Sequence, residues 1–411
     1  MNGDPMHIAP LHVAPLHVGV DATSWHNDRG FGRFTRELIE ALAARDSGFR
    51  YTLVFDRLPD GELPPGVDVI AAATERTLQE SAVGTSSRSP AYLWKVGRAA
   101  RRAAFDVFFF PAVYSYFPIL ARVPCVVCFH DATAERLPHL LFPSRLNHGL
   151  WRLTTALARR QATRAMTDSR ASADDLVALH GIAPERIDVV TEAADPAFRP
   201  IDDPEVARRA RRRHQVPDGA TLLVYVGGMN AHKNLLGLLR AMPRVVATRP
   251  DAQLAIVGDT SGRGFWDDVP GLQRFVAEHP PLERHVRFTG RLPDAELVEL
   301  LSGTQALVFP SLWEGFGLPA VEAMSCGVPV LASDRSSLPE VIGDAGLFFD
   351  PEDPDDIAAC LLRFAADPAL GPRLGRLALE RAGRFSWQRA AELAEQSFRR
   401  CHADARSAQR R

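Results

Sequence analysis

Two successive series of short apolar segments, each alternating with longer amphipathic ones, constrain the fold of this chain more than any other feature. The first series begins with the apolar run His17–Asp21. The segment that follows, Arg33–Ala44, repeats Phe34, Leu38 and Leu42 every four residues, which is the spacing of one helix face. Strands that alternate with helices are typical of a parallel sheet covered by helices on both faces.

The alternation restarts after Pro217 and predicts a second domain of the same kind. Further strands of the first series are predicted over Tyr51–Phe55, Val67–Ala71, Val107–Phe110, Val123–Phe129, Ala165–Thr167 and Ile187–Val190. Strands of the second series are predicted over Leu222–Val226, Gln253–Val257, Val286–Thr289, Ala306–Phe309 and Val328–Ala332. The fold class is therefore α/β, with two doubly wound, Rossmann-like domains. Such domains bind a ligand at the carboxyl ends of their strands, in the cleft between them.

The length of 411 residues fits this organisation. We predict an N-terminal domain over 17–200, a C-terminal domain over 217–385, and a last helix over 386–405. The prolines and arginines of 195–215 predict a linker followed by a solvated helix. Residues 1–16 repeat His-Ile/Val-Ala-Pro-Leu without a basic leader, which predicts a disordered extension and no secretory signal.

The charge balance argues against a protein built mainly to bind nucleic acid, because 48 basic and 50 acidic residues give a formal net charge of -2. The charge is uneven, since residues 76–170 hold 14 basic and 5 acidic side chains. This basic region would suit an anionic lipid surface or a phosphate-bearing acceptor, and it could equally be a set of solvated helix faces. The longest apolar run, 107–121, contains two prolines and is shorter than the about 20 residues that span a bilayer. We expect a cytoplasmic protein, with peripheral contact to the inner face of the membrane as a hypothesis.

Five widely spaced cysteines fit a reducing compartment. Cys125 and Cys128 have the spacing of half a zinc site, but no second pair follows. Residues three apart on a strand face opposite sides of the sheet, so we predict two core cysteines.

One strand-to-helix junction of the second series suits a diphosphate. Gly227 and Gly228 follow a strand, and glycines let the backbone approach a ligand closely. Lys233 precedes the next helix, whose free N–H groups carry about half a positive charge. It is one of two lysines among the 48 basic residues, the other being Lys95. A compact ammonium group suits a phosphate.

A second junction is the segment Glu314-Gly-Phe-Gly-Leu-Pro-Ala-Val-Glu322. We predict Glu314 in the loop and Glu322 on the first turn of the next helix, both pointing into the cleft. Carboxylates accept hydrogen bonds from adjacent sugar or ribose hydroxyls. The alternative is that both are exposed on a surface loop. In the first domain, His130 follows a strand and either faces the same cleft or is a satisfied core histidine.

Together these motifs resemble those of the retaining GT-B glycosyltransferases of family 4. The resemblance covers nearly the whole chain beyond residue 16. It implies that the domain over 17–200 is the acceptor side and that the domain over 217–385 binds the nucleotide sugar. It also implies that the last helix crosses back to the N-terminal domain and that the chain transfers a hexose from a nucleotide sugar. Besides the two-glutamate motif, it rests on Gly30-Phe-Gly-Arg-Phe-Thr35, His130-Asp131, Glu185-Arg-Ile187, Lys233-Asn234 and Phe385-Ser-Trp387.

The resemblance implies a role for each matching residue. Lys233 would bind the donor diphosphate and stabilise the departing nucleotide, while Glu322 would hold the ribose. Glu314 would contact the transferred sugar, and His130 would lie beside it and steady the transition state. Gly30 and Gly32 would form a loop that faces donor and acceptor. The rest of the donor-binding backbone would be that of Gly227, Gly228, Gly315, Phe316, Gly317 and Leu318.

The sequence departs from the family pattern at Gly228, where many members have an arginine that partners the lysine on the phosphates. We favour Arg33 as the group that supplies this charge from the other domain.

No dedicated nucleophile is evident, and similarity suggests front-side transfer with retention at the anomeric carbon. Asp353-Pro-Asp355 has the spelling of a metal-binding Asp-x-Asp motif, but it precedes a helix over Asp356–Ala366 and predicts capping acids. We therefore expect no metal and no other cofactor. The expected partners are a nucleotide sugar and a glycan, lipid-linked or small-molecule acceptor.

Several alternatives stay open. The Gly-Phe-Gly-Arg-Phe-Thr loop resembles that of bacterial mannosyltransferases in polysaccharide assembly, which favours GDP-mannose over UDP-linked donors such as UDP-glucose. A sugar-nucleotide 2-epimerase has the same architecture. A dinucleotide oxidoreductase is remote, because no Gly-x-Gly-x-x-Gly follows either first strand. The intact set of Lys233, Glu314, Glu322 and His130 argues against a catalytically silent binding partner.

Overall fold

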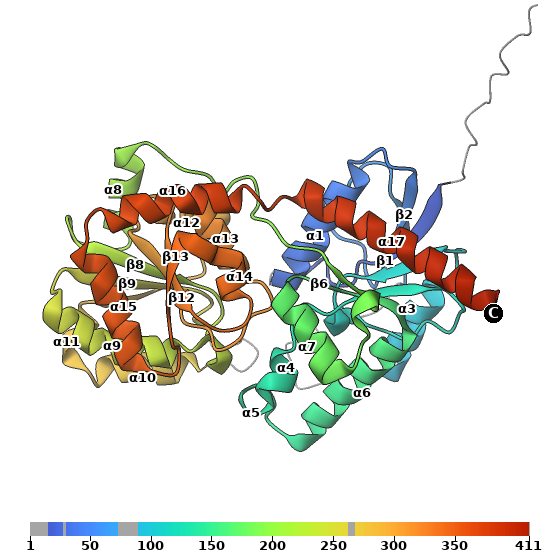
Figure 1. Cartoon of the computed structure of the whole chain (residues 1–411), viewed down its shortest axis with the longest axis horizontal. Coiled ribbons are helices and arrows are strands. Elements are labelled where there is room, and N and C mark those ends of the chain that lie inside the picture. Colours follow the sequence, from blue (N-terminus) through green and yellow to red (C-terminus); the bar gives the residue numbers. More distant parts are fainter. Residues whose placement is uncertain (1–14, 28–29, 73–88, 262–267, 411) are drawn as a thin grey trace, which may run out of the picture.

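The computed structural model describes residues 15–27, 30–72, 89–261 and 268–410 of the chain. It contains two parallel sheets, one in each half of the molecule (Figure 1). The strand orders are β3-β2-β1-β4-β5-β6-β7 and β10-β9-β8-β11-β12-β13. In both sheets the order reverses beside the first strand, so both are doubly wound as predicted, and ligands of such sheets bind beyond the carboxyl ends of the strands at that point.

The strands are short and mostly buried. In the first sheet they are β1 Leu16–Asp21, β2 Phe49–Phe55, β3 Asp68–Ala71, β4 Val107–Phe110, β5 Cys125–Cys128, β6 Ala162–Thr167 and β7 Ile187–Val189. In the second they are β8 Thr221–Val226, β9 Ala252–Val257, β10 Val286–Gly290, β11 Ala306–Phe309, β12 Val330–Ser333 and β13 Gly346–Phe349.

The helices lie between the strands in chain order. Those of the first half are α1 Gly30–Ala43, α3 Pro90–Ala99, α4 Thr133–Arg136, α5 Pro138–Leu141, α6 Arg145–Gln161 and α7 Arg170–His180. Those of the second half are α8 Pro204–Arg213, α9 Leu235–Thr248, α10 Val269–Ala277, α11 Pro280–Glu283, α12 Asp294–Ser302, α13 Leu318–Ser325, α14 Leu338–Ile342, α15 Pro354–Ala366 and α16 Leu370–Ala382. The last helix is α17 Trp387–Gln409.

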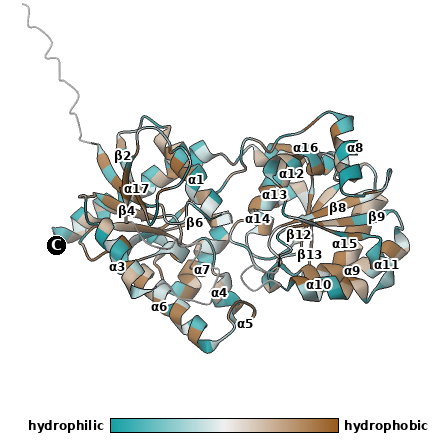
Figure 2. Cartoon of the chain, turned by 180° about the vertical axis from the view of Figure 1, so that it is seen from behind, coloured by the Kyte–Doolittle hydropathy of each residue, from teal (hydrophilic) through white to brown (hydrophobic). Residues whose placement is uncertain are grey.

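Helices cover both faces of the first sheet. Apolar side chains of α1 and α17 share one core cluster with the strands, and those of α3, α6 and α7 share the cluster on the opposite face. The second sheet has a single core cluster of its own. The hydropathy colouring agrees, with strands mostly hydrophobic and helices of mixed character (Figure 2).

The C-terminal helix α17 crosses back to the N-terminal domain, as the family resemblance implied (Figure 1). It packs on α1 and on β4 to β7, and Phe398 and Cys401 are fully buried there. Arg164 of β6 pairs with Asp404 at 2.8 Å, and Ser397 donates a hydrogen bond to Asp188 at 2.6 Å. The helix therefore fastens the end of the chain to the first sheet.

Several local expectations need correction. The arginine-rich helix α8 is solvated at Arg208, Arg209, Arg212 and Arg213, as predicted, but it also packs on α12 of the C-terminal domain. Its Arg211 is buried and donates to the carbonyl oxygens of Gly303 and Ala220, because these buried carbonyls need donors. Leu16 already pairs in β1, while the rest of the expected extension, residues 1–14, lies outside the described residues. Strand β13 was not predicted from the sequence.

The glycines expected in a loop at residues 30 and 32 instead form the first turn of α1. A Cβ on Gly32 would lie 1.9 Å from the carbonyl oxygen of Asn27, so glycine allows that chain segment to lie against the helix.

Two expectations are confirmed. Cys125 and Cys128 are free, buried, and belong to the core clusters on opposite faces of the sheet. Asp353 is the N-cap of α15 and accepts a hydrogen bond from the backbone N–H of Asp355 at 2.9 Å. No helix among the described residues is long and apolar enough to cross a membrane.

Candidate functional site

Three acidic or basic side chains follow three neighbouring strands of the first sheet. His130 lies two residues after β5, Asp168 directly after β6, and Glu192 three residues after β7. Because these strands are parallel and adjacent, their carboxyl ends bring the three side chains together. His130 Nδ1 lies 2.7 Å from Asp168 Oδ2 and 3.8 Å from Glu192 Oε1. All three are buried.

This environment favours a charged His130. Burial lowers the pKa of the imidazole, but the adjacent Asp168 carboxylate outweighs burial, and the resulting pKa lies well above the ordinary value. Burial raises the pKa of Glu192 well above its usual range, and the nearby Asp168 raises it further. The Nε2 atom of His130 is buried and has no hydrogen-bond partner within the described residues. A buried donor without a partner is costly, so Nε2 is available to a ligand oxygen.

The same cluster contains the one group of candidate metal ligands found among the described residues, Cys128, His130 and Asp168. The Cys128 sulfur lies 3.8 Å from both His130 Nδ1 and Asp168 Oδ1. Burial raises the pKa of this thiol to about 12, and a metal binds the thiolate rather than the thiol. The donor set therefore fits a hydrogen-bonded His–Asp pair better than a metal centre.

The predicted diphosphate lysine lies across the domain junction from this cluster. Lys233 ends the short 3-10 turn Ala231–Lys233, and its Nζ lies 2.7 and 2.9 Å from the two carboxylate oxygens of Glu314. Asn234 adopts a left-handed conformation and donates to the carbonyl oxygens of Pro310 and Pro351. The asparagine thus fixes the turn that presents the lysine.

The second glutamate lies on α13, one turn further in than the predicted first turn. Glu322 is buried and forms an ion pair with Arg33 of the other domain. Arg33 also binds both oxygens of Asp294, at 2.8 and 2.7 Å, at the start of α12. Burial raises the pKa of Glu322 to about 7, although Arg33 opposes this. Arg33 therefore reaches the second domain, where it contacts carboxylates.

Gly315 brings the two domains into direct contact. Its carbonyl oxygen accepts hydrogen bonds from Ser169 at 2.7 Å and Ser172 at 3.1 Å in the first domain. A Cβ at this position would lie only 2.1 Å from the carbonyl oxygen of His130. Other hydrogen bonds also cross the junction: Trp313 Nε1 donates to Asp175 at 3.0 Å, and Glu340 accepts from the backbone N–H groups of Arg170 and Ala171, both at 3.1 Å.

Replacing Gly315 by alanine should therefore force the domains apart. Since the clash is with backbone, no side-chain rotation relieves it, and a displacement of about 1 Å can cost about 100-fold in rate. We expect Gly315→Ala to slow by about 100-fold the donor turnover that the family resemblance implies, measured as nucleotide release. Gly149→Ala on α6 is the control, because nothing lies within 4 Å of a Cβ there. Turnover of Gly315→Ala within twofold of the wild type would contradict this interpretation of the junction.

The remaining residues predicted to bind the donor through their backbone lie at the two strand-to-helix junctions of the C-terminal domain and at the start of α1. Gly317 has a φ of 96° and is the N-cap of α13, so Phe316, Gly317 and Leu318 lead into the helix N-terminus. Such a terminus carries unpaired N–H groups that suit an anion. Gly227 has a φ of 151°, and the carbonyl oxygen of the exposed Gly228 accepts a hydrogen bond from Tyr225. Gly30 is exposed at the start of α1.

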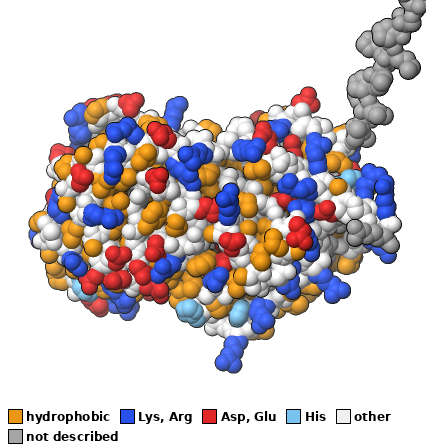
Figure 3. All heavy atoms as spheres, in the orientation of Figure 1, with side chains coloured by type: hydrophobic (Ala, Val, Ile, Leu, Met, Phe, Trp, Pro, Cys, Tyr) orange, Lys and Arg blue, Asp and Glu red, His pale blue; other side chains and the backbone are white. Residues whose placement is uncertain are grey.

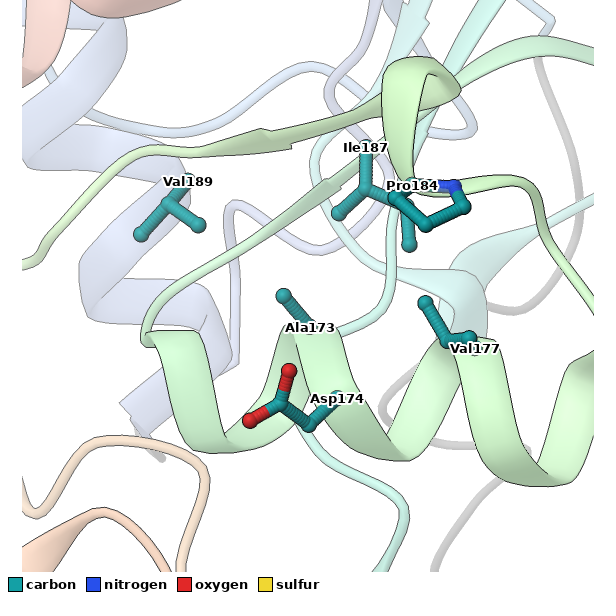
Figure 4. A pocket seen from close by; sticks show the side chains of 6 residues that line it. All are labelled: Ala173, Asp174, Val177, Pro184, Ile187 and Val189. Carbon is teal, nitrogen blue, oxygen red and sulfur yellow. The ribbon is translucent and has the colours of Figure 1, made fainter.

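A shallow pocket between α7 and β7 is unrelated to these residues (Figure 4). Its lining is mostly apolar, with Asp174 as the one charged side chain, and includes none of the predicted site residues. Nothing in this pocket suggests chemistry.

Sequence reasoning missed Asp168, Glu192 and Asp294. The first two could have been found, because each follows a strand that neighbours the His130 strand. Nothing local in the sequence indicates that Asp294 binds an arginine 261 residues away.

Two facing, doubly wound domains joined by a crossing C-terminal helix define a protein of GT-B architecture. Two family models match the chain: Glycosyltransferase Family 4 over residues 29–198 and Glycosyl transferases group 1 over residues 206–381. O-antigen chain mannosyltransferase B of Escherichia coli is 34% identical over 264 residues, 64% of this chain and 67% of that protein. A D-inositol 3-phosphate glycosyltransferase of Kribbella flavida is 27% identical over 397 residues, 90% of each chain. The chain belongs to the group 1 glycosyltransferases.

Solved structures support the fold. A sucrose-phosphate synthase from Thermosynechococcus elongatus matches with a TM-score of 0.75 at 21% identity, over 94% of this chain and 99% of that one. Anabaena HepE in complex with UDP and glucose matches with a TM-score of 0.68 at 19% identity, over 93% and 98%.

Proposed function

We propose that the chain is a retaining hexosyltransferase that transfers mannose from GDP-mannose to a glycan, lipid-linked or small-molecule acceptor in polysaccharide or glycoconjugate assembly. The observation that carries the proposal is the pairing of Lys233 with Glu314 and of Arg33 with Glu322 at the domain junction. Each cation there is balanced by a carboxylate. A nucleotide sugar can replace both pairs, because its diphosphate takes the cations and its hydroxyls take the carboxylates.

The mechanism follows from where charge develops. As the glycosidic bond to the diphosphate breaks, the leaving nucleotide gains negative charge. Lys233 and the N–H groups at the start of α13 lie where they can stabilise it. His130, positioned by Asp168, would direct Nε2 toward the transferred sugar, with Glu314 on the opposite side of the junction. The acceptor would attack from the face that the nucleotide leaves, so the anomeric configuration is retained.

We further propose that the reaction requires no metal. Lys233 and the helix terminus supply positive charge that a divalent cation would otherwise provide. Of the Asp-x-Asp pair, Asp353 caps α15, and Asp355 lies in the first turn and pairs with Arg244 at 2.9 Å.

The choice of GDP-mannose rests on the mannosyltransferase relative and is open to direct test. The purified protein would be incubated in EDTA with GDP-mannose and, separately, with UDP-glucose, together with a mannose-terminated acceptor. Nucleotide release and the anomeric signal of the product would be followed by NMR. Release of GDP with an α-linked product supports the proposal. Release of UDP instead would favour the UDP-sugar alternative, and an epimerised free sugar without transfer would favour the 2-epimerase.

Arg33 is proposed to support the departing phosphate in place of the arginine absent at Gly228. We expect Arg33→Ala to slow transfer by about 100-fold while nucleotide affinity changes less than threefold, because the charge matters most in the transition state. Steady-state kinetics and calorimetric titration would measure the two quantities. Arg244→Ala, which removes an exposed ion pair with Asp355, is the control. An equal loss of rate and affinity would overturn this role.

Glu322 should make donor binding depend on pH. Its pKa of about 7 means that the carboxylate that would hold the ribose is protonated as the pH falls below 7. We expect the Kd for the intact nucleotide sugar to rise about tenfold per pH unit below 7 and to be flat above it. The intact sugar nucleotide is the probe because its diphosphate diester does not titrate in this range. Glu322→Gln should abolish the slope, and a slope that persists in this variant would rule out Glu322 as its source.

A further inference from the structure

Helix α6 has the reverse of the usual arrangement for a helix that covers a sheet. Its buried residues are the small side chains Thr155 and Ala158. Its large apolar side chains point outward instead. They are Leu146, Leu150, Leu153 and Leu157, with exposed fractions of 71%, 42%, 57% and 42%. At 3.6 residues per turn these four leucines lie within about 60° of one another around the helix.

Arginines lie along one side of this stripe. Arg145, Arg152, Arg159 and Arg160 are all exposed, and α6 has no acidic residue. At 3.6 residues per turn Arg160 is nearest to the leucines, whereas Arg159 is almost opposite them and donates to the carbonyl oxygen of His180. We call the four leucines with Arg145, Arg152 and Arg160 the leucine–arginine face. A soluble protein seldom exposes a contiguous row of large apolar side chains without a partner.

Exposed apolar and basic side chains continue from α6 onto the neighbouring loop and α3. Loop residues 116–122 join α6 to α3: Gln161 donates to the carbonyl oxygen of Ile119 at 2.8 Å, and Gly97 of α3 abuts the carbonyl oxygen of Pro118. Trp94 on α3 and Leu120 in the loop are 58% and 72% exposed. Residues 90–122 and 145–161, all of them described, contain nine basic side chains and one acidic one. The space-filling view shows Lys or Arg and hydrophobic side chains mixed at the lower rim, where α6 lies (Figure 3).

We propose that the leucine–arginine face binds the surface of a bilayer that contains anionic phospholipids. The leucines would insert at the boundary between headgroups and acyl chains, and the arginines would contact lipid phosphates. Charge argues against a second copy of the chain as the occupant. A two-fold interface would place this basic surface against its own copy. The leucine–arginine face lies within the broad basic region 76–170 identified from the sequence. Residues 76–88 of that region lie outside the described residues.

Vesicle sedimentation tests the proposal without any substrate, so its outcome is independent of the proposed function. The full chain would be mixed with vesicles of phosphatidylcholine alone or of phosphatidylcholine with phosphatidylglycerol. We expect sedimentation with the anionic vesicles only, weakened by salt. Replacing the four leucines by glutamine should lower partitioning by at least about tenfold, and Arg145→Gln with Arg152→Gln should also lower it.

Matched controls lie in the other domain. Arg212→Gln on the arginine-rich helix α8 and Leu379→Gln on α16, whose leucine is 40% exposed, should leave partitioning unchanged. Light scattering without lipid gives the oligomeric state, and thermal unfolding confirms that each variant is folded. The proposal is overturned if the wild type ignores anionic vesicles, if the four-leucine variant partitions as the wild type does, or if that variant converts a dimer to a monomer.

Discussion

Lys233→Ala should lower the rate of nucleotide release from the donor by about 100- to 1000-fold, the range found when one group that stabilises transition-state charge is removed. The ammonium group lies 2.7 Å from Glu314 at the domain junction and is proposed to neutralise the leaving diphosphate. Donor hydrolysis, in which water replaces the acceptor, suffices as the assay because it requires no knowledge of the acceptor.

Two controls separate chemistry from folding. Lys95→Ala removes the other lysine of the chain, which is exposed on α3, and should leave the rate within twofold. Lys233→Ala leaves the buried Glu314 without its cation, which destabilises the fold on its own. The double variant Lys233→Ala with Glu314→Gln should therefore recover thermal stability without recovering the rate. Recovery of both would show that the lysine only balances a buried charge.

His130→Ala should lower the rate of donor hydrolysis by about 100-fold or more, with a smaller effect on nucleotide binding. The reason is that Nε2 is proposed to contact the transferred sugar rather than the nucleotide, and Asp168 holds the ring charged at neutral pH. Asp168→Asn should lower the rate less than His130→Ala does. It should also shift to lower pH the point at which the rate falls as the pH rises, since the histidine would lose its proton more readily.

His17→Ala is the matched control for this variant. His17 is as buried as His130, with 8% against 7% exposed, but it lies near the start of β1, at the opposite end of the sheet. Its replacement should lower thermal stability while leaving the rate per folded molecule unchanged. If both histidine variants lost activity in proportion to stability, His130 would have no role beyond packing.

The sequence predicted the fold well because the pattern that specifies it is local. Each short apolar run had to be buried on both faces, and most predicted strands differ from the observed ones by one or two residues. The strand β13 was missed because Gly346-Leu-Phe-Phe349 is brief and directly follows α14 and a 3-10 turn over Gly343–Ala345. Helix α8 was misread because its arginines indicate a wet surface, whereas Arg211 is buried by carbonyl acceptors that come from distant residues.

The sequence indicated several residues of the candidate site but not their pairings. Lysine and glycine at strand-to-helix junctions are recognisable from residue type and position alone. The Arg33–Glu322 pair joins residues 289 positions apart and depends on how the two domains face each other, which no local pattern contains. The same holds for Gly315, whose missing side chain matters only because the His130 carbonyl lies against it.

Calorimetric titration with GDP and with UDP, in EDTA and alongside Lys233→Ala, tests the central claim most directly. The account predicts that GDP binds with a micromolar Kd without metal and that Lys233→Ala abolishes this binding, because the lysine is the main cation proposed for the diphosphate. Binding of neither nucleotide, or binding only after a divalent metal is added, would contradict a metal-free nucleotide-sugar site at the junction of the two domains.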